Sequence, residues 1–220
     1  MATDVNSGER FRVLGIDPGT NYMGYGVVEV CSGRMSSVVM GVIDMHKMSD
    51  PYAKLQHIFE RVGHVIDEYR PREVALEAPF FGENVQSMLK LGRAQGVAMA
   101  AALSRGVDVF EYAPTRVKQA VAGRGAATKE QLARMVSSIL KVELLDDRYD
   151  ATDAQAVAIC HVMTFGSALN GQLDSARSKG LGGGRKSLSR GGSSSWEQFV
   201  KSNPERTSDG DRQPRRVKKP

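Results

Sequence analysis

Short apolar stretches separated by polar turns open the chain. Residues 11–17 (FRVLGID) run into Pro-Gly, a pattern typical of a strand that ends in a turn. Two further apolar stretches follow over residues 25–30 and 37–43, again with polar residues between them. Successive strands joined by short turns pair in antiparallel fashion, so the pattern predicts a three-stranded meander.

Beyond residue 50 the spacing of apolar residues changes to that of helices alternating with short strands. Residues 52–69 place apolar side chains at helical spacing, and short buried strands are predicted over residues 73–77 and 107–112. Further helices are predicted over residues 84–104, 115–122, 128–140 and 151–165. This order predicts an α/β fold with a mixed five-stranded sheet flanked by helices, the ribonuclease H-like plan.

Charge separates this folded region from the end of the chain. The formal net charge is +5, but residues 171–220 hold 12 Lys+Arg and 5 Asp+Glu, against 18 and 20 in residues 1–170. Residues 169–220 are also rich in Gly and Ser, so they cannot bury enough apolar surface to fold. We expect a flexible N-terminus (1–10), one folded domain (11–168) and a disordered basic tail (169–220). The tail either keeps the protein in solution or contacts DNA phosphates without sequence preference.

Composition also excludes several classes of protein. The two cysteines, Cys31 and Cys160, lie far apart, which argues against a disulfide framework or a zinc site and is typical of a reducing compartment. The N-terminus has no apolar signal sequence, and the longest apolar run, residues 96–103, is too short to span a bilayer. We expect a cytoplasmic protein without a membrane partner.

Four acidic residues stand where apolar stretches meet turns or where a helix begins. Asp17 and Glu77 follow buried strands, and Asp150 and Asp153 lie three apart at the start of the last helix. Each has an ordinary explanation: a turn for Asp17, a structural salt bridge for Glu77, and helix capping for the other two. Together, however, they form a carboxylate cluster, which is unfavourable without a cation.

The expected cation is Mg²⁺, because hard divalent ions prefer oxygen ligands. Four carboxylates could hold two ions roughly 3.5–4 Å apart, with Mn²⁺ as a substitute. One ion would activate the attacking water, and the other would stabilise the leaving 3′-oxygen. The pattern therefore indicates a metal-dependent phosphodiester hydrolase.

Other candidates surround this cluster. His161 falls on nearly the same helical face as Asp153, and we expect it to support or pack the site instead of binding metal. The helix over residues 84–104 has one apolar stripe expected to cover the sheet, which includes Val85, Leu89 and Leu103, and further small residues on its other side, Ala94, Ala98, Ala101 and Ala102. Gly92 and Gly96 would allow close approach of another backbone. The excess favours a symmetric homodimer contact.

Several blocks of the sequence resemble one known family. LGIDPGTNYMGYGVV, VALEAPFF, NVQSMLKLGRAQGVA, VFEYAPTRVKQAVAG and DATDAQAVAICH occur in the order found in RuvC-type Holliday-junction resolvases, from about residue 11 to residue 165. The resemblance implies a homodimeric, Mg²⁺-dependent endonuclease that resolves four-way DNA junctions by paired nicks in recombination and repair. It also implies cooperation with a RuvA–RuvB branch-migration complex.

Residue roles follow from the resemblance by position. The metal-binding and catalytic carboxylates fall on the four acids already named, and DNA-contacting residues fall on Phe80, Lys118 and Lys129. Phe80 corresponds to an aromatic wedge among the bases, but Phe81 is adjacent and either could serve. The basic tail extends beyond what the resemblance accounts for.

Three other functions compete with this interpretation. Actin-like kinases and chaperones also begin with a GIDxGT-like strand and turn, but they need a second such domain, for which the chain is too short. A silent junction-binding scaffold would gain nothing from four negative charges facing DNA. A nuclease for RNA–DNA hybrids shares the acids but not the other resolvase-like blocks.

Overall fold

The first three strands form the predicted antiparallel meander. In the computed structural model they are β1 (Phe11–Asp17), β2 (Tyr22–Cys31) and β3 (Arg34–Asp44), paired β1 with β2 and β2 with β3. The structure describes residues 10–79, 84–143 and 149–178, with side chains up to residue 164. Residues 1–176 form one compact unit.

Two parallel strands complete the sheet. β4 (Glu73–Glu77) lies beside β1, and β5 (Asp108–Tyr112) lies beside β4, so the order is β3-β2-β1-β4-β5. The predicted mixed five-stranded sheet is therefore confirmed. Because β1 is central and parallel to β4, the C-terminal ends of these two strands meet at one edge of the sheet.

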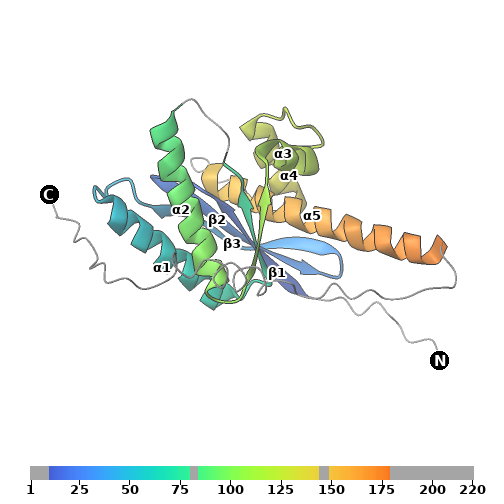
Figure 1. Ribbon diagram of the computed structural model, residues 1–220. Helices are drawn as coiled ribbons and strands as arrows, with labels where there is room; N and C mark the ends of the chain where they lie inside the picture. Colours follow the sequence, from blue (N-terminus) through green and yellow to red (C-terminus); the bar gives the residue numbers. More distant parts are fainter. Residues whose placement is uncertain (1–9, 80–83, 144–148, 179–220) are drawn as a thin grey trace, which may run out of the picture. The chain divides into compact units, whose positions relative to one another are not determined.

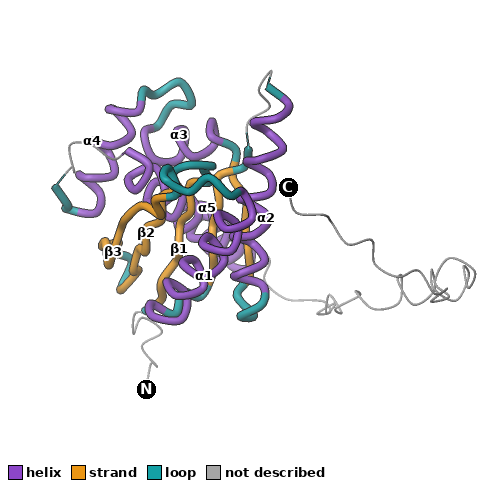
Figure 2. Tube along the Cα trace, turned by 90° about the vertical axis from the view of Figure 1, so that its left-hand side faces the viewer, coloured by secondary structure: helices purple, strands orange, loops and turns teal. Residues whose placement is uncertain are grey.

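Helices cover both faces of the sheet (Figures 1 and 2). α1 (Pro51–Tyr69) and α2 (Val85–Leu103) share one core with Leu14 and Ile16 of β1. α3 (Pro114–Ala122), α4 (Lys129–Leu140) and α5 (Tyr149–Ser178) lie over the other face, where Val13 is buried. The alternation along β1 divides its side chains between the two cores, as the period of two in a strand requires.

Backbone contact between α5 and the sheet depends on glycines. A methyl group at Gly15 would lie 1.9 Å from the carbonyl oxygen of Ala154, and one at Gly24 would lie 1.9 Å from that of Asp150. Neither position tolerates a side chain, because the helix backbone occupies that space. The close approach sets how far the start of α5 lies from β1 and β2.

Two helices differ from the prediction in extent or orientation. α5 continues to Ser178, well past the expected end at residue 165, so residues 169–178 at the start of the predicted tail are helical. On α2 the alanines at 94, 98, 101 and 102 are buried, whereas Val85, Leu89 and Leu103 are exposed. Small residues thus face the sheet and the larger apolar residues face outward. No helix among the described residues is long and apolar enough to cross a membrane.

Candidate active site

Two of the predicted acids lie at neighbouring strand ends. Asp17 is the last residue of β1 and Glu77 the last of β4, and the residues before them, Ile16 and Leu76, are paired in the parallel ladder. Asp17 shares its face of β1 with Gly15, which contacts α5. The strand period therefore directs the Asp17 carboxylate toward the α5 side of the sheet.

The other two acids come from the first turns of α5. Asp150 and Asp153 are three residues apart, so they share one side of the helix. Gly24, whose contact with the Asp150 backbone was described above, is the antiparallel partner of Asp17. The glycine contact thus brings the start of α5 over the end of β1, and the acids of three separate segments form one cluster.

The pKa values record how closely these carboxylates interact. Burial first, and then repulsion from Glu77, Asp153 and Asp150, raises the pKa of Asp17 to about 8. Burial and the charge of Asp153 raise the pKa of Glu77 to about 7. Burial also raises the pKa of Asp153, which is 8% exposed. Ionising the whole cluster is therefore unfavourable unless a positive charge enters it.

Two lysines supply part of that positive charge. The Nζ atom of Lys129 lies 3.3 Å from Oδ2 of Asp153, and this contact raises the pKa of Lys129. Lys129 begins α4, whose start is held by a capping box between Thr128 and Gln131. Lys118 on α3 acts at longer range, since its charge lowers the pKa values of Glu77 and Asp153. Both predicted basic residues therefore border the acidic cluster.

The carboxylates are near one another without converging on one point. Among the residues that the structure describes, no three Asp, Glu, His or Cys side chains are already arranged to hold a metal ion. Mutual repulsion favours this spread arrangement. All the donors are carboxylate oxygens, and such a donor set is nevertheless that of a site for a hard divalent cation.

One supporting residue was missed by the sequence analysis. Gln95 on α2 is only 4% exposed, and its Nε2 atom donates to the Glu77 carbonyl oxygen at 3.4 Å and to Oε1 of Glu111 at 2.8 Å. It ties α2 to the strand end that carries Glu77. The only sign of this role in the sequence is that Gln95 is polar while its neighbours on the same side of the helix are small and apolar.

His161 is a packing residue, one of the two roles expected for it. Its Nε2 is 2.8 Å from Oε2 of Glu73 and its Nδ1 is 2.9 Å from the Tyr112 hydroxyl. Glu73 begins β4, about 13 Å along the strand from Glu77. His161 therefore links α5 to β4 and β5 away from the acids, as a packing group and not as a ligand of the cluster. Burial lowers its pKa, which favours the neutral ring.

The predicted aromatic wedge is not located. Phe80 and Phe81 both lie outside the described residues, in the segment that follows β4. Ala78, just before it, donates its backbone N–H to the Tyr112 carbonyl oxygen at 2.8 Å. The choice between the two phenylalanines stays a prediction.

Comparisons with known proteins place the chain in a family. Residues 13–161 match the profile of the family described as crossover junction endodeoxyribonuclease RuvC. The protein of that name from Bacteroides fragilis is 48% identical over 196 residues, covering 88% of this chain and 94% of the relative. The one from Cytophaga hutchinsonii is 47% identical over 194 residues, covering 88% and 86%. These alignments cover 88% of the chain, and residues 1–168 are a smaller share of it than that. The alignments therefore include part of the predicted tail.

Solved structures agree with these sequence matches. RuvC of T. thermophilus in complex with Holliday junction substrate superposes with a TM-score of 0.68 at 34% identity, covering 72% of this chain and 96% of that one. The yeast mitochondrial Holliday junction resolvase Ydc2 has the same fold at 12% identity and a TM-score of 0.58. Fold, sequence profile and close relatives agree, and the chain belongs to the RuvC family of crossover junction endodeoxyribonucleases.

Proposed function

We propose that this crossover junction endodeoxyribonuclease cuts four-way DNA junctions with Mg²⁺ ions bound by Asp17, Glu77, Asp150 and Asp153. The observation that carries the proposal is the gathering of four carboxylates from β1, β4 and α5 at one edge of the sheet, with the pKa values of Asp17, Glu77 and Asp153 raised. A cluster that resists ionisation is suited to binding a divalent cation. Two ions are the expected number, and Mn²⁺ is expected to substitute.

Bound Mg²⁺ would supply Lewis-acid stabilisation of the charge that develops on the phosphodiester oxygens. The protein's own contribution is to hold the carboxylates on rigid strand ends and on a helix pressed against glycines. Their spread arrangement implies that the side chains rotate inward when cations enter. All four residues lie on regular elements, which fix their backbones at this edge of the sheet.

Lys118 and Lys129 are proposed to contact the DNA phosphate near the cut. Lys129 is held by Asp153 in the protein alone, and its side chain is 61% exposed, so it can exchange that carboxylate for a phosphate oxygen. Lys118 already acts electrostatically on two of the acids. A phosphate brought to this edge would meet positive charge that offsets its repulsion by the carboxylates.

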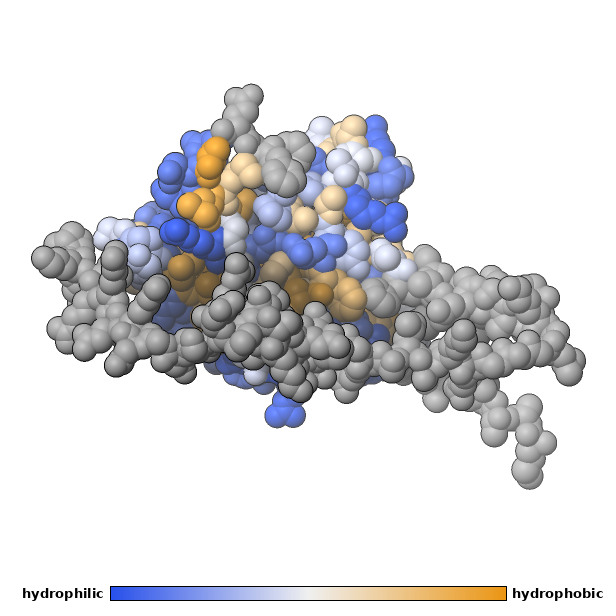
Figure 3. Space-filling model, viewed as in Figure 1, coloured by the Kyte–Doolittle hydropathy of each residue, from blue (hydrophilic) through white to orange (hydrophobic). Residues whose placement is uncertain are grey.

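Dimerisation is proposed through the outer side of α2. Val85, Leu89 and Leu103 are 74%, 50% and 60% exposed, and apolar residues gather over the upper part of α2 in Figure 3. A methyl group at Gly92 or Gly96 would meet nothing within 4 Å, so another backbone could approach closely. Two copies related by a twofold axis would bring two active sites to the two opposed strands of a junction.

The remaining parts of the proposal follow from the family. Junction resolution places the protein in DNA recombination and repair in the cytoplasm, with a RuvA–RuvB branch-migration complex as partner. Phe80 or Phe81 is proposed to insert among the bases at the crossover. The basic residues 179–220 are proposed to remain a disordered tail.

Cleavage of a labelled mobile four-way junction, compared with a linear duplex and an RNA–DNA hybrid of matching sequence, tests this function. Paired, symmetric nicks in the junction alone, dependent on Mg²⁺, are the expected result. Equal cutting of the duplex or the hybrid would move the function to a general nuclease. Binding of the junction without cutting under any divalent metal would favour a scaffold.

A further inference from the structure

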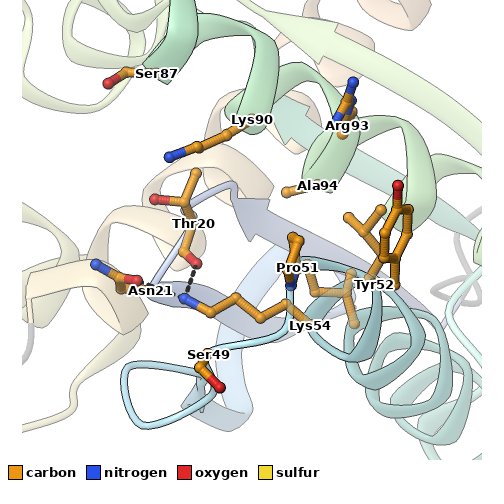
Figure 4. Close-up of a pocket in the computed structure, with 12 residues that line it drawn as sticks. Thr20, Asn21, Ser49, Pro51, Tyr52, Lys54, Ser87, Lys90, Arg93 and Ala94 are labelled. Atoms are coloured by element: carbon orange, nitrogen blue, oxygen red, sulfur yellow. Dashed lines mark hydrogen bonds between the residues drawn. The ribbon is translucent and has the colours of Figure 1, made fainter. Parts of the chain in front are cut away.

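A pocket lined by both polar and apolar side chains lies beside the turn after β1, on the side of the sheet that α1 and α2 cover (Figure 4). Its volume is about 370 Å³, within the range of about 300–1,000 Å³ that is usual for ligand sites. The turn after β1, the start of α1 and the first half of α2 form its walls. The lining residues used below are Thr20, Tyr52, Lys54, Ser87, Lys90 and Arg93.

The pocket is strongly positive. Three cations line it, Lys54, Lys90 and Arg93, and no acidic side chain lies among the described residues that border it. Lys54 is already committed, because its Nζ donates to the Thr20 carbonyl oxygen at 3.2 Å and to Oδ1 of Asn21 at 2.7 Å. This lysine fixes the turn that forms one wall and adds a positive charge, and it makes no ion pair with a described carboxylate.

The other two cations remain available. Lys90 and Arg93 are exposed, and neither makes a hydrogen bond or ion pair with another described residue. Lys90 extends from α2 across the pocket toward Thr20 in Figure 4. Hydroxyl groups of Ser87 and Thr20 lie at the same pocket. Arg93 lies farther along α2 in Figure 4 and points away from Lys90. Exposed lysine and arginine side chains with hydroxyls at the same pocket are groups that bind phosphate oxygens.

The position of the pocket relates it to the DNA that the protein cuts. Thr20 is three residues after Asp17, a separation of at most about 10 Å along the chain. That reach corresponds to about three nucleotide steps of 3.4 Å along a stacked strand. A strand with its scissile phosphate at the acids could therefore pass over the sheet edge and place a nearby phosphate in the pocket.

We propose that this pocket binds a backbone phosphate of the substrate DNA, within about three nucleotides of the cut, through Lys90 and Arg93. The Tyr52 ring, 72% exposed at the rim, offers a surface on which the adjoining sugar or base packs. The inference rests on the proposed function, since it takes the acidic cluster as the cutting site. It adds a second anchor that fixes the direction in which the strand crosses the sheet edge.

The test measures junction binding by the full chain, without divalent ions, as a function of salt concentration. Lys90→Gln and Arg93→Gln are compared with Arg34→Gln, an exposed arginine in the β2–β3 hairpin at the opposite end of the sheet. Each pocket substitution should weaken binding and lower the salt slope by about one, the effect of losing one phosphate contact. Arg34→Gln should leave both unchanged.

A phosphate-neutralisation scan locates the contact. Junctions carrying single methylphosphonates near the cut should bind the unaltered chain more weakly at one position, and the Lys90→Gln/Arg93→Gln double variant should be insensitive at that same position. Unchanged salt slopes, or the same sensitive positions in both proteins, would overturn the proposal. Sedimentation of the double variant must show the same oligomeric state as the unaltered chain, and a changed state together with an unchanged scan would also overturn it.

The two proposals fail separately. If Mg²⁺-dependent junction cutting is absent but the double variant loses one phosphate contact, the result supports the pocket as a DNA site and contradicts the cutting function. If cutting is present and the double variant gives the same scan as the unaltered chain, only the pocket assignment is contradicted. Chemical modification of Lys90 gives a further control. If inorganic phosphate protects Lys90 from modification and junction DNA does not, the pocket binds small anions instead.

Discussion

At the residue scale, the decisive property is the resistance of Asp17 to ionisation. Its carboxyl group is enclosed by the sheet and α5 and faces three other acids, which raises its pKa to about 8. In the unfolded chain the same group has an ordinary pKa near 4. Without a cation, the folded state is therefore penalised as pH rises between these two values, and the penalty stays constant above about pH 8.

Asp17→Asn should remove this penalty. The comparison is made in the presence of a chelator. Between pH 5 and pH 8, the unfolding free energy of the unaltered chain should fall more than that of the variant, by at least about 1.4 kcal/mol, the equivalent of one pKa unit. Denaturant unfolding at the two pH values measures this difference. Asp108→Asn, an exposed carboxylate at the start of β5, is the control and should shift stability by less than about 0.5 kcal/mol. A pH-independent difference for Asp17→Asn would contradict the assigned environment.

The sequence was sufficient to nominate the acids, because each interrupts an apolar stretch at a strand end or a helix start. It could not nominate Gln95, since one glutamine in a helix carries no sign of the strand it will contact. For His161 the sequence offered two roles, support of the acids or packing, and the structure shows packing, because the eight residues after Asp153 carry His161 to the far end of β4. Direction around a helix was predictable, and distance along the sheet was not.

At the element scale, the placement of α5 governs the site. Gly15 and Gly24 allow the helix backbone to lie against β1 and β2, and His161 fastens the same helix to Glu73 and Tyr112 farther along. Two contacts well separated along one helix define its axial position. The acids at its start are therefore positioned by residues that take no part in the chemistry.

Gly15→Ala should displace α5 from the sheet. The added methyl group would meet the Ala154 carbonyl oxygen, a backbone atom that can yield only if the helix moves. We expect a loss of stability of about 1–3 kcal/mol, as for overpacked cores, and weaker Mg²⁺ binding. Calorimetric titration with Mg²⁺ and denaturant unfolding check the two effects. Unchanged stability and Mg²⁺ affinity would show that the close approach is not a constraint.

His161→Leu should destabilise the fold without touching the acids. The substitution leaves the Glu73 carboxylate and the Tyr112 hydroxyl without their buried partner, and the expected loss is about 2–4 kcal/mol. His64→Leu on α1, where the side chain is 63% exposed, is the matched control, with an effect below about 0.5 kcal/mol. Urea denaturation compares the two. Equal effects would mean that the His161 contacts contribute nothing specific.

The order of elements was predictable because apolar periodicity changes clearly from strand to helix along the chain. The sheet-facing side of α2 was not, since both sides of the helix carry apolar or small residues. The structure buries the alanines at 94, 98, 101 and 102 in the core that α2 shares with α1 and the sheet. The end of α5 was also missed, because the apolar pattern stops before the helix does.

At the scale of the whole molecule, the outward apolar side of α2 and the basic pocket belong to one account of junction binding. The apolar side would pair two copies, and the pocket would guide each substrate strand toward its acids. Both features are formed by residues that the structure describes. The basic tail, if it contacts DNA, would add affinity without direction.

Leu89→Glu should separate the two copies. A charge at the centre of an apolar contact must be desolvated without a partner, which should weaken dimerisation at least about tenfold. Sedimentation velocity over a range of protein concentrations measures the change, and paired nicking should give way to single nicks. Val38→Glu, at an exposed valine on the edge strand β3, is the control. A dimer unaffected by Leu89→Glu would place the contact elsewhere.

The measurement that tests the central claim most directly follows cleavage and binding of a four-way junction by Asp17→Asn in the same preparation. If the acids hold the metal, cleavage in Mg²⁺ should fall by at least about 100-fold, while junction affinity without metal stays the same or rises because one negative charge is gone. Retained cleavage would contradict the metal-site assignment. Equal loss of binding and cleavage would instead make Asp17 a structural residue.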